Sequence, residues 1–402
     1  MKIFVVIVQI VLTLQLQHKV FGFLVPRTTT ADRIRNFGYS SESHNVVTKD
    51  GYILSMFRVK NITLTTQGPK PVVLMIHGLT SSSDIFIIRG AKDALAFNLV
   101  DAGYDVWLAN CRGNTYSNRH LTLSTNDRRY WQYSWDVMAV NDLPMFIDYV
   151  LKMTQQASLH YVGHSQGTAI MFALLSQQPR YNKKLKTTHM FAPIAYMRYA
   201  QSMAIRLSAP LLGTYGPLDP LYGDRAFLQN PLFLQLSGIA KCRSPLTFPG
   251  ICAFWVGVAG GFTNHTSESL YPEIFNTHPS PSSAHQFIHL VQLYVSGHFR
   301  SYDYGLQGNM KRYNRTTPPD YRVENINPKF PINLYYSDYD VLSSKRDSEH
   351  FSAILGKRSV RHFIDVPNFN HFDFLWSIKV KETINRGVLQ RINEAEALLA
   401  KT

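Results

Sequence analysis

The sequence predicts an α/β fold built on a mostly parallel β-sheet. Apolar runs at residues 71–77 and 104–109 have the pattern of strands that are buried on both faces of a parallel sheet. Helical patterns at residues 91–99 and 135–153 alternate with these runs. A chain in which strands and helices alternate favours a parallel sheet with right-handed crossover connections.

A short helix and a hairpin are expected before the first buried strand. Residues 31–37 have a helical pattern. Two strand patterns, at residues 39–48 and 52–59, flank Lys49-Asp50-Gly51, which is a turn signal. We therefore expect these two segments to pair as an antiparallel hairpin.

The alternation of strands and helices stops near residue 194 and resumes near residue 330. Residues 190–193 end a strand, and the chain then mixes helical runs with many Pro, Gly and Ser residues. Strand patterns return at residues 330–336 and 360–366, and a terminal helix is expected from Phe372. The simplest interpretation is one core interrupted by an inserted, mainly helical cap. The expected boundaries are 23–194 for the first part of the core, 195–320 for the cap and 321–402 for the second part.

Residues 163–167, Gly-His-Ser-Gln-Gly, match the pattern G-x-S-x-G. An apolar strand pattern at residues 159–162 precedes them and a helical pattern at residues 168–175 follows. Strand, tight turn and helix are the context of a nucleophile elbow, in which the serine hydroxyl is held at the tip of a sharp turn. The five-residue pattern also occurs by chance, but this context makes Ser165 a candidate nucleophile.

A nucleophilic serine needs a general base and an acid that orients it. In hydrolases of this type the chain order is serine, acid, histidine. His371 lies in the loop after the strand at residues 360–366, whereas His362 lies inside that strand and is expected to be a packing or surface residue. Two candidate acids, Asp338 and Asp340, follow the strand at residues 330–336, and the residues alone do not choose between them.

An oxyanion hole needs two backbone N–H donors near the nucleophile. The residue after the serine, Gln166, should supply one donor. The second should come from the loop after an early strand, where Gly78 allows a close backbone approach, and we assign it to Leu79. The alternative is that Gly78 is only an ordinary strand-ending glycine.

The N-terminus has the pattern of a secretory signal peptide. Lys2 is followed by an apolar run at residues 3–14, then by polar residues and a plausible cleavage point after Gly22. The apolar run is short for a membrane span, and no later run is long enough, so no transmembrane segment is expected. We expect residues 1–22 to be removed and the mature protein to be secreted, with the lysosome lumen as the alternative.

The net charge is +14, from 41 Lys and Arg against 27 Asp and Glu. These basic residues are scattered rather than gathered in long runs, which favours a solvated basic surface and argues against binding of nucleic acid. No metal cluster, phosphate loop or nucleotide fingerprint stands out, so neither a metal nor another cofactor is expected. No obligate protein partner is evident either.

The chain has three cysteines, and an oxidising compartment would allow one disulfide. Cys242 and Cys252 are close in sequence and bracket Pro and Gly residues, so we expect them to form a local bridge. Cys111 follows a strand and is expected to be a buried free thiol. Three sequons for N-glycosylation begin at Asn61, Asn264 and Asn314.

Four segments together resemble the acid lipase family. They are His77-Gly78-Leu79, residues 104–114 (YDVWLANCRGN), residues 163–167 (GHSQG) and residues 371–374 (HFDF). The resemblance runs from about Gly38 to the terminal helix. It implies an α/β-hydrolase core with a helical cap and a mobile lid, acting on esters of long-chain fatty acids such as acylglycerols or sterol esters.

The resemblance also bears on individual residues. The family's acid lies in a D-x-L turn, which Asp340-Val341-Leu342 matches, so Asp340 is favoured over Asp338. Gastric members have a cap disulfide that is similar to the expected Cys242–Cys252 bridge. The chain departs from the family pattern at Val137, at Asn141 and at residues 279–283 (PSPSS), which bears on substrate range and cap packing.

Two strongly apolar stretches, at residues 231–236 and 251–258, lie inside the expected cap. They are either cap core or a lid that covers an acyl pocket and turns towards lipid at an interface. The sequence thus predicts a serine lipase whose substrate is a lipid ester at an oil–water or membrane interface. A soluble short-chain carboxylesterase and a non-catalytic lipid-binding protein on the same fold are the alternatives.

Overall fold

The computed structural model describes residues 28–63, 70–216, 222–229, 234, 237 and 239–401. The expected signal peptide, residues 1–22, lies outside the described residues, as does most of the apolar stretch at residues 231–236. Within the described parts of the chain, none of the helices combines the length and apolar character needed to span a membrane.

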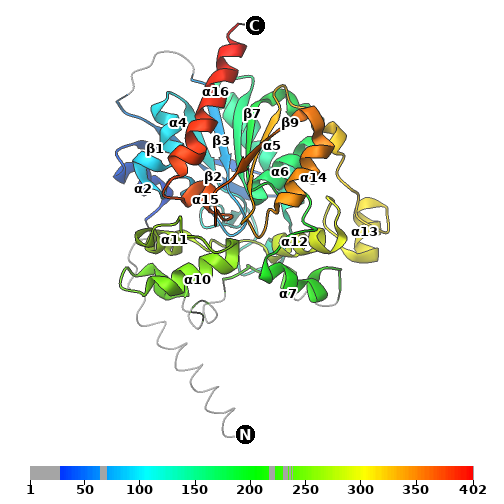
Figure 1. Cartoon of the computed structure of the whole chain (residues 1–402). Helices are drawn as coiled ribbons and strands as arrows, with labels where there is room; N and C mark the ends of the chain where they lie inside the picture. The colour runs from blue at the N-terminus through cyan, green and yellow to red at the C-terminus, as the bar shows by residue number, and fades with distance from the viewer. Residues whose placement is uncertain are drawn as a thin grey trace.

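A single twisted sheet forms the centre of the molecule (Figure 1). Its strand order is β1-β2-β4-β3-β6-β7-β8-β9, and β5 pairs with β2 beside this path. The strands from β4 to β9 in this order are parallel, whereas β1, β2 and β5 form the antiparallel part. The predicted fold class is confirmed. The strands are β1 (Ser40–Val47), β2 (Tyr52–Lys60), β3 (Val72–Ile76), β4 (Asp105–Ala109), β5 (Arg119–His120), β6 (Leu159–His164), β7 (Leu185–Phe191), β8 (Ile332–Ser337) and β9 (Ser359–Ile364).

Helices cover both faces of the sheet because each face is apolar. Alternate side chains of β3 enter two different cores: Leu74 packs with α5, α6 and α14, whereas Val73 and Met75 pack with α2, α4 and α16. The helices outside the β7–β8 connection are α2 (Thr30–Asn36), α3 (Gly90–Asp93), α4 (Leu95–Asp101), α5 (Trp135–Thr154), α6 (Gln166–Gln177), α14 (Lys345–Leu355), α15 (Asp373–Trp376) and α16 (Arg386–Leu399).

The direction of the winding reverses at β3. The chain passes from β3 to β4 on one side and later places β6 on the other side of β3, so the loops after β3 and β6 diverge at the carboxyl edge of the sheet. In open α/β sheets, ligands bind outside the carboxyl ends of the strands at such a switch point. The topology therefore places a binding site beside the loops that contain Gly78 and Ser165.

A long helical insertion joins β7 to β8 and lies against this carboxyl edge (Figure 1). We call residues 195–331 the insertion. Its described helices are α7 (Met203–Leu212), α10 (Pro249–Gly260), α11 (Tyr271–Thr277), α12 (Ala284–Ser296) and α13 (Gly305–Tyr313). A disulfide joins Cys242 to Cys252, with Cα atoms 5.6 Å apart, and ties the short helix at Ile239–Arg243 to α10. Cys111 is a buried free thiol.

Two helix predictions differ from the structure. The helical pattern at residues 91–99 forms two helices, α3 and α4, because Ala94 has an extended backbone. The terminal helix does not run on from Phe372: α15 ends at Trp376, and the chain is helical again in a π-helix at Lys381–Asn385, which leads directly into α16 at Arg386. The break occurs where the Ile378 N–H donates to the His265 carbonyl oxygen of the insertion at 2.8 Å, a long-range bond that replaces continuation of the helix.

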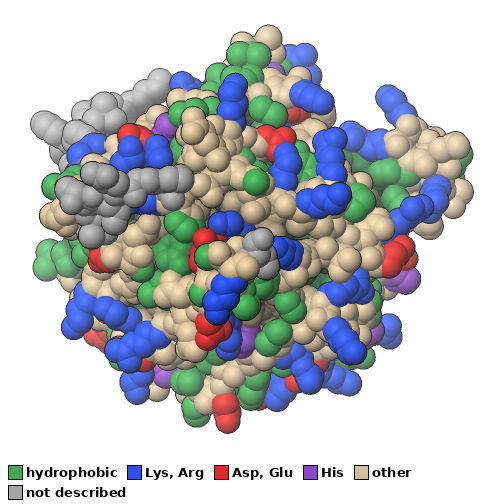
Figure 2. Space-filling model, turned by 90° about the horizontal axis from the view of Figure 1, so that it is seen from above, with side chains coloured by type: hydrophobic (Ala, Val, Ile, Leu, Met, Phe, Trp, Pro, Cys, Tyr) green, Lys and Arg blue, Asp and Glu red, His purple; other side chains and the backbone are tan. Residues whose placement is uncertain are grey.

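The surface around the carboxyl end of α16 carries Lys and Arg side chains in several separate groups, with Asp, Glu and apolar side chains between them (Figure 2). This distribution agrees with the scattered basic residues of the sequence.

Candidate active site

Ser165 occupies a sharp turn between β6 and α6. Its φ is 53° and its ψ is −121°, a strained conformation for a residue with a side chain. The turn depends on the flanking glycines. A Cβ at Gly167 would lie 2.4 Å from the Ile76 carbonyl oxygen, and a Cβ at Gly163 would lie 2.9 Å from the ring of Tyr161. The predicted strand–turn–helix context of Ser165 is therefore present.

His371 and Asp340 form a buried hydrogen-bonded pair. The Nδ1 of His371 lies 2.9 and 2.8 Å from the two carboxylate oxygens of Asp340. The backbone N–H groups of Leu342 and Ser343 also donate to Asp340, each at 2.8 Å, which fixes the carboxylate. Both side chains of the pair are almost completely buried.

The competing acid, Asp338, lies elsewhere. Its carboxylate is half exposed and pairs with Lys345 at 3.3 Å. The structure thus brings Asp340 to His371, as the D-x-L resemblance favours. His362 is in β9, where its Nε2 lies 2.8 Å from the Asn333 side-chain oxygen and its ring stacks on Tyr335.

The loop after β3 packs directly against the serine. A Cβ at Gly78 would lie 2.9 Å from the Ser165 Cβ and 3.3 Å from its Oγ, so only glycine fits this approach. Leu79 follows in the same loop, and Gln166 is the first residue of α6. Both expected oxyanion donors therefore lie on segments that meet at Ser165.

His77 belongs to the His77-Gly78-Leu79 segment of the family resemblance, but the sequence did not predict its supporting role. Its Nε2 accepts a hydrogen bond from the Cys111 N–H at 3.1 Å, so its Nδ1–H donates to the Gly78 carbonyl oxygen at 2.8 Å. Burial lowers the pKa of His77 to about 4, which keeps the ring neutral. Asn114 also contacts the His77 ring, at 3.1 Å, so two residues of the run at 104–114 hold this ring.

His164 holds the backbone of His371 in place through a hydrogen bond. Its Nε2 donates to the His371 carbonyl oxygen at 2.8 Å, and the two ring centroids lie 5.0 Å apart. Burial, and then the neighbouring His371, lower the pKa of His164 well below its usual range, so it is neutral and adds no positive charge beside His371.

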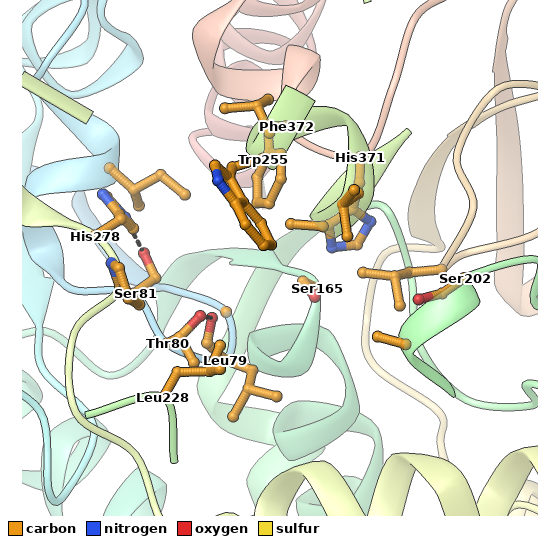
Figure 3. Close-up of a pocket in the computed structure, with 18 of the residues that line it drawn as sticks. Leu79, Thr80, Ser81, Ser165, Ser202, Leu228, Trp255, His278, His371 and Phe372 are labelled. Carbon is orange, nitrogen blue, oxygen red and sulfur yellow. Dashed lines mark hydrogen bonds between the residues drawn. The ribbon is translucent and has the colours of Figure 1, made fainter. Parts of the chain in front are cut away.

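An apolar cavity of about 340 Å³ opens above Ser165. In Figure 3, Ser165 lies at its centre, with His371, Phe372 and Trp255 on one side and Leu79 and Leu228 on the other. The insertion supplies much of the wall, through α7, α10 and α11. Apolar walls with a few polar groups such as Ser165 are typical of small-molecule binding pockets.

The remaining predicted sites lie away from the cavity. The side chains of Asn264 and Asn314 are exposed, and the amide of Asn61 donates to Asp101 at 2.9 Å. Glycosylation at these sequons stays a prediction. Across the residues that the structure describes, no group of three or more His, Cys, Asp or Glu side chains is arranged to hold a metal ion.

Two family models match the chain. The model described as "Partial alpha/beta-hydrolase lipase region" matches residues 30–90, and the model described as "alpha/beta hydrolase fold" matches residues 71–193. Together with the sheet order and the turn at Ser165, these matches define an α/β-hydrolase.

Named relatives narrow this class. "Lipase 3" of Drosophila melanogaster is 35% identical over 373 residues, which cover 92% of this chain and 94% of the relative. "Gastric triacylglycerol lipase" of Bos taurus is 34% identical over 366 residues, 90% of each chain. The Homo sapiens protein of the same name is 33% identical over 390 residues, 94% of this chain and 95% of the relative. The chain belongs to the acid lipase family.

Solved structures share the fold at low sequence identity. A soluble variant of monoglyceride lipase from Saccharomyces cerevisiae superposes with a TM-score of 0.56 at 16% identity, covering 88% of this chain and 94% of the other. A carboxyl esterase from Bacillus coagulans superposes with a TM-score of 0.54 at 12% identity, covering 88% and 98%.

Asp373 connects the loop of His371 to the insertion, and its protonation should make the free energy of unfolding depend on pH. It accepts hydrogen bonds from the Thr263 hydroxyl at 2.6 Å and the Asn370 N–H at 2.8 Å. Burial nevertheless raises the pKa of Asp373 to about 6 from 3.8. Between these two values the folded protein binds more protons than the unfolded chain, so the free energy of unfolding falls as the pH rises through this window.

In the variant Asp373→Asn, we expect the loss of unfolding free energy between pH 4 and pH 6 to be smaller by about 2 kcal/mol, because this titration is absent. Urea unfolding at several pH values measures it. Asp365→Asn, an exposed aspartate of the preceding loop, is the control. Equal pH dependence in wild type and Asp373→Asn would contradict the assignment.

Proposed function

We propose that the protein is a serine lipase that hydrolyses carboxylic esters of fatty acids through an acyl-enzyme. The observation that carries the proposal is that Ser165 and His371 both line an apolar cavity, and that the buried carboxylate of Asp340 is hydrogen-bonded to His371. The names of the relatives support the substrate class. We take acylglycerols as the substrate, with sterol esters as the second candidate.

The hydrogen bonds of His371 support its role as general base. Because Nδ1–H donates to Asp340, Nε2 carries the lone pair and is free to take the Ser165 proton. Ser165 Oγ then attacks the ester carbonyl, and Asp340 stabilises the imidazolium that forms. His371 returns the proton to the leaving alcohol, and a water molecule activated by His371 releases the fatty acid from Ser165.

The backbone N–H groups of Leu79 and Gln166 act as the oxyanion donors. Gln166 is at the N-terminus of α6, where the partial positive charge of the helix favours the developing oxyanion. Gly78 allows Leu79 to approach, and His77 orients the peptide unit between Gly78 and Leu79 through its bond to the Gly78 carbonyl.

The insertion presents an apolar outer surface that we assign to lipid contact. Along α7, Met203, Leu207 and Leu211 recur every four residues with 64%, 72% and 61% of their surface exposed. Leu246 and Phe248, just before α10, are 94% and 77% exposed. Residues of α7 and α10 also line the cavity. A lipid surface that covers these exposed apolar side chains would therefore lie next to the cavity.

The proposed compartment is extracellular or the lysosome lumen. The N-terminal pattern of residues 1–22 supports entry into the secretory pathway. The Cys242–Cys252 disulfide is in keeping with an oxidising compartment.

Substitution of the triad tests the mechanism. Ser165→Ala should lower kcat by several orders of magnitude, and Asp340→Asn by roughly 10⁴-fold, because His371 loses its orienting acid. Initial rates on emulsified triacylglycerol and on a soluble short-chain ester measure both effects. Asp338→Asn is the matched control and should stay within about twofold of wild type, since Asp338 contacts only Lys345 among the described ion pairs.

The same rates separate the alternatives. Cleavage of the soluble ester without activity on the emulsion would indicate a short-chain carboxylesterase. A correctly folded protein that cleaves neither would indicate a lipid-binding protein.

Substitution of the outer face of α7 tests the assignment of the lipid contact. The double variant Leu207→Ser, Leu211→Ser removes two exposed leucines, each worth about 2 kcal/mol on entering lipid. We expect its rate at low emulsion concentration to fall at least tenfold, while its rate on a soluble ester stays within about twofold. Leu398→Ser, 55% exposed on α16, is the control. A double variant with wild-type emulsion kinetics would place lipid contact elsewhere.

A further inference from the structure

The loop after β3 is hydrogen-bonded to the insertion on both sides of Thr80. The Thr80 N–H donates to the Ser282 hydroxyl at 3.1 Å, and the Thr80 carbonyl oxygen accepts from the Ser280 N–H at 2.7 Å. Thr80 has a φ of 54°, which is unusual for a β-branched residue and persists only where surrounding contacts hold it. These contacts come from residues about 200 positions later in the chain.

The same loop makes a third bond to the insertion. The Ser81 hydroxyl lies 2.8 Å from His278 Nε2, and Figure 3 shows this pair beside the cavity, on the side away from His371. The neighbouring Thr80 hydroxyl donates to the Leu79 carbonyl oxygen at 2.7 Å. The peptide unit that follows Leu79 is therefore fixed at its carbonyl by Thr80 and at its N–H by Ser282.

Gln166 is also held by the insertion. Its side-chain Nε2 donates to the Gln286 Oε1 at 2.6 Å, and both glutamines are almost completely buried. Gln286 is in the first turn of α12, only four residues after Ser282. One segment, residues 278–286, thus bonds to Gln166 and to Thr80, the residue that directly follows Leu79.

This segment is itself fixed to the core. The Ser280 hydroxyl accepts a hydrogen bond from the Thr115 N–H at 3.0 Å. The Ser283 hydroxyl donates to the Trp131 carbonyl oxygen, and Ser283 also caps α12. Residues 278–286 are therefore hydrogen-bonded both to the core and to the residues beside the cavity. The segment includes the serines at residues 279–283, where the chain departs from the acid lipase pattern.

We infer that Ser282 and Gln286 are positioning residues that hold the two halves of the oxyanion hole in place. The inference rests on the proposed function, since it takes the Leu79 and Gln166 N–H groups as the donors. The geometry of such donors must match the oxyanion closely, because they act only when charge develops in the transition state. The insertion then takes part in catalysis in addition to covering the cavity. Loss of its contacts should lower kcat and leave KM nearly unchanged.

The experiment compares Ser282→Ala and Gln286→Met with wild type on a soluble short-chain ester, which leaves lipid contact out of the measurement. Deleting an oxyanion donor lowers kcat by 10²–10³-fold in known enzymes, so for displaced donors we expect a loss of roughly tenfold. KM should change less than about twofold, and the rate constant for inactivation by an alkyl phosphonate, which forms a tetrahedral adduct, should fall in parallel with kcat.

Two controls separate positioning from general loosening of the insertion. Gln292→Met removes another buried glutamine of α12, whose amide bonds to Asp303 within the insertion. Ser267→Ala removes a surface hydroxyl whose partner among the described residues is Ser269. Both controls should keep kcat within about twofold of wild type. If Ser282→Ala fails to fold, Gln286→Met tests the inference alone.

The inference is overturned if Ser282→Ala and Gln286→Met keep wild-type kcat and inactivation rates, or if Gln292→Met loses as much as they do. A wild-type protein without Ser165-dependent turnover would reject the proposed function and the inference with it. An active wild type with unaffected variants would reject the inference alone.

Discussion

The site depends on the close approach of two backbones, the loop after β3 and the turn at Ser165. The parallel register that pairs Ile76 with Gly163 brings them together. At this point Gly167 faces the Ile76 carbonyl and Gly78 faces Ser165, and neither position has room for a Cβ. Because interiors are close-packed, a methyl group at either glycine would push Ser165 away from the loop after β3, where we propose one oxyanion donor. The glycines at positions 78 and 167 are thus the residues in the sequence that most directly reflect this close approach.

The polar groups of the site are held by neutral, buried neighbours. His77 fixes the Gly78 carbonyl and His164 fixes the His371 carbonyl, and burial lowers the pKa of both rings. Neutral histidines supply directed hydrogen bonds without adding charge beside the Asp340–His371 pair. The insertion completes this arrangement, since its residues wall the cavity and bond to the loop after β3.

Local patterns predicted the fold class, the turn at Ser165 and the position of His371, because each depends on residues that are near in sequence. Asp338 and Asp340 match the expected position of the orienting acid equally well, and the resemblance to the acid lipase family was needed to favour Asp340. The bonds of Thr80 to Ser282 and of Gln166 to Gln286 join residues far apart in the chain and leave no periodic signal. The break before α16 was missed for the same reason, since it depends on the contact of Ile378 with His265. The signal peptide and the sequons stay predictions.

The most direct test of the central claim is active-site labelling with a long-chain alkyl fluorophosphonate, followed by peptide mass spectrometry. A serine lipase with this site should take up one phosphonyl group per chain, on Ser165, with complete loss of ester hydrolysis. The label should form far more slowly in a His371→Ala variant, which lacks the base that activates Ser165. An unlabelled Ser165 in an active protein, or a label on another residue that abolishes activity, would contradict the account.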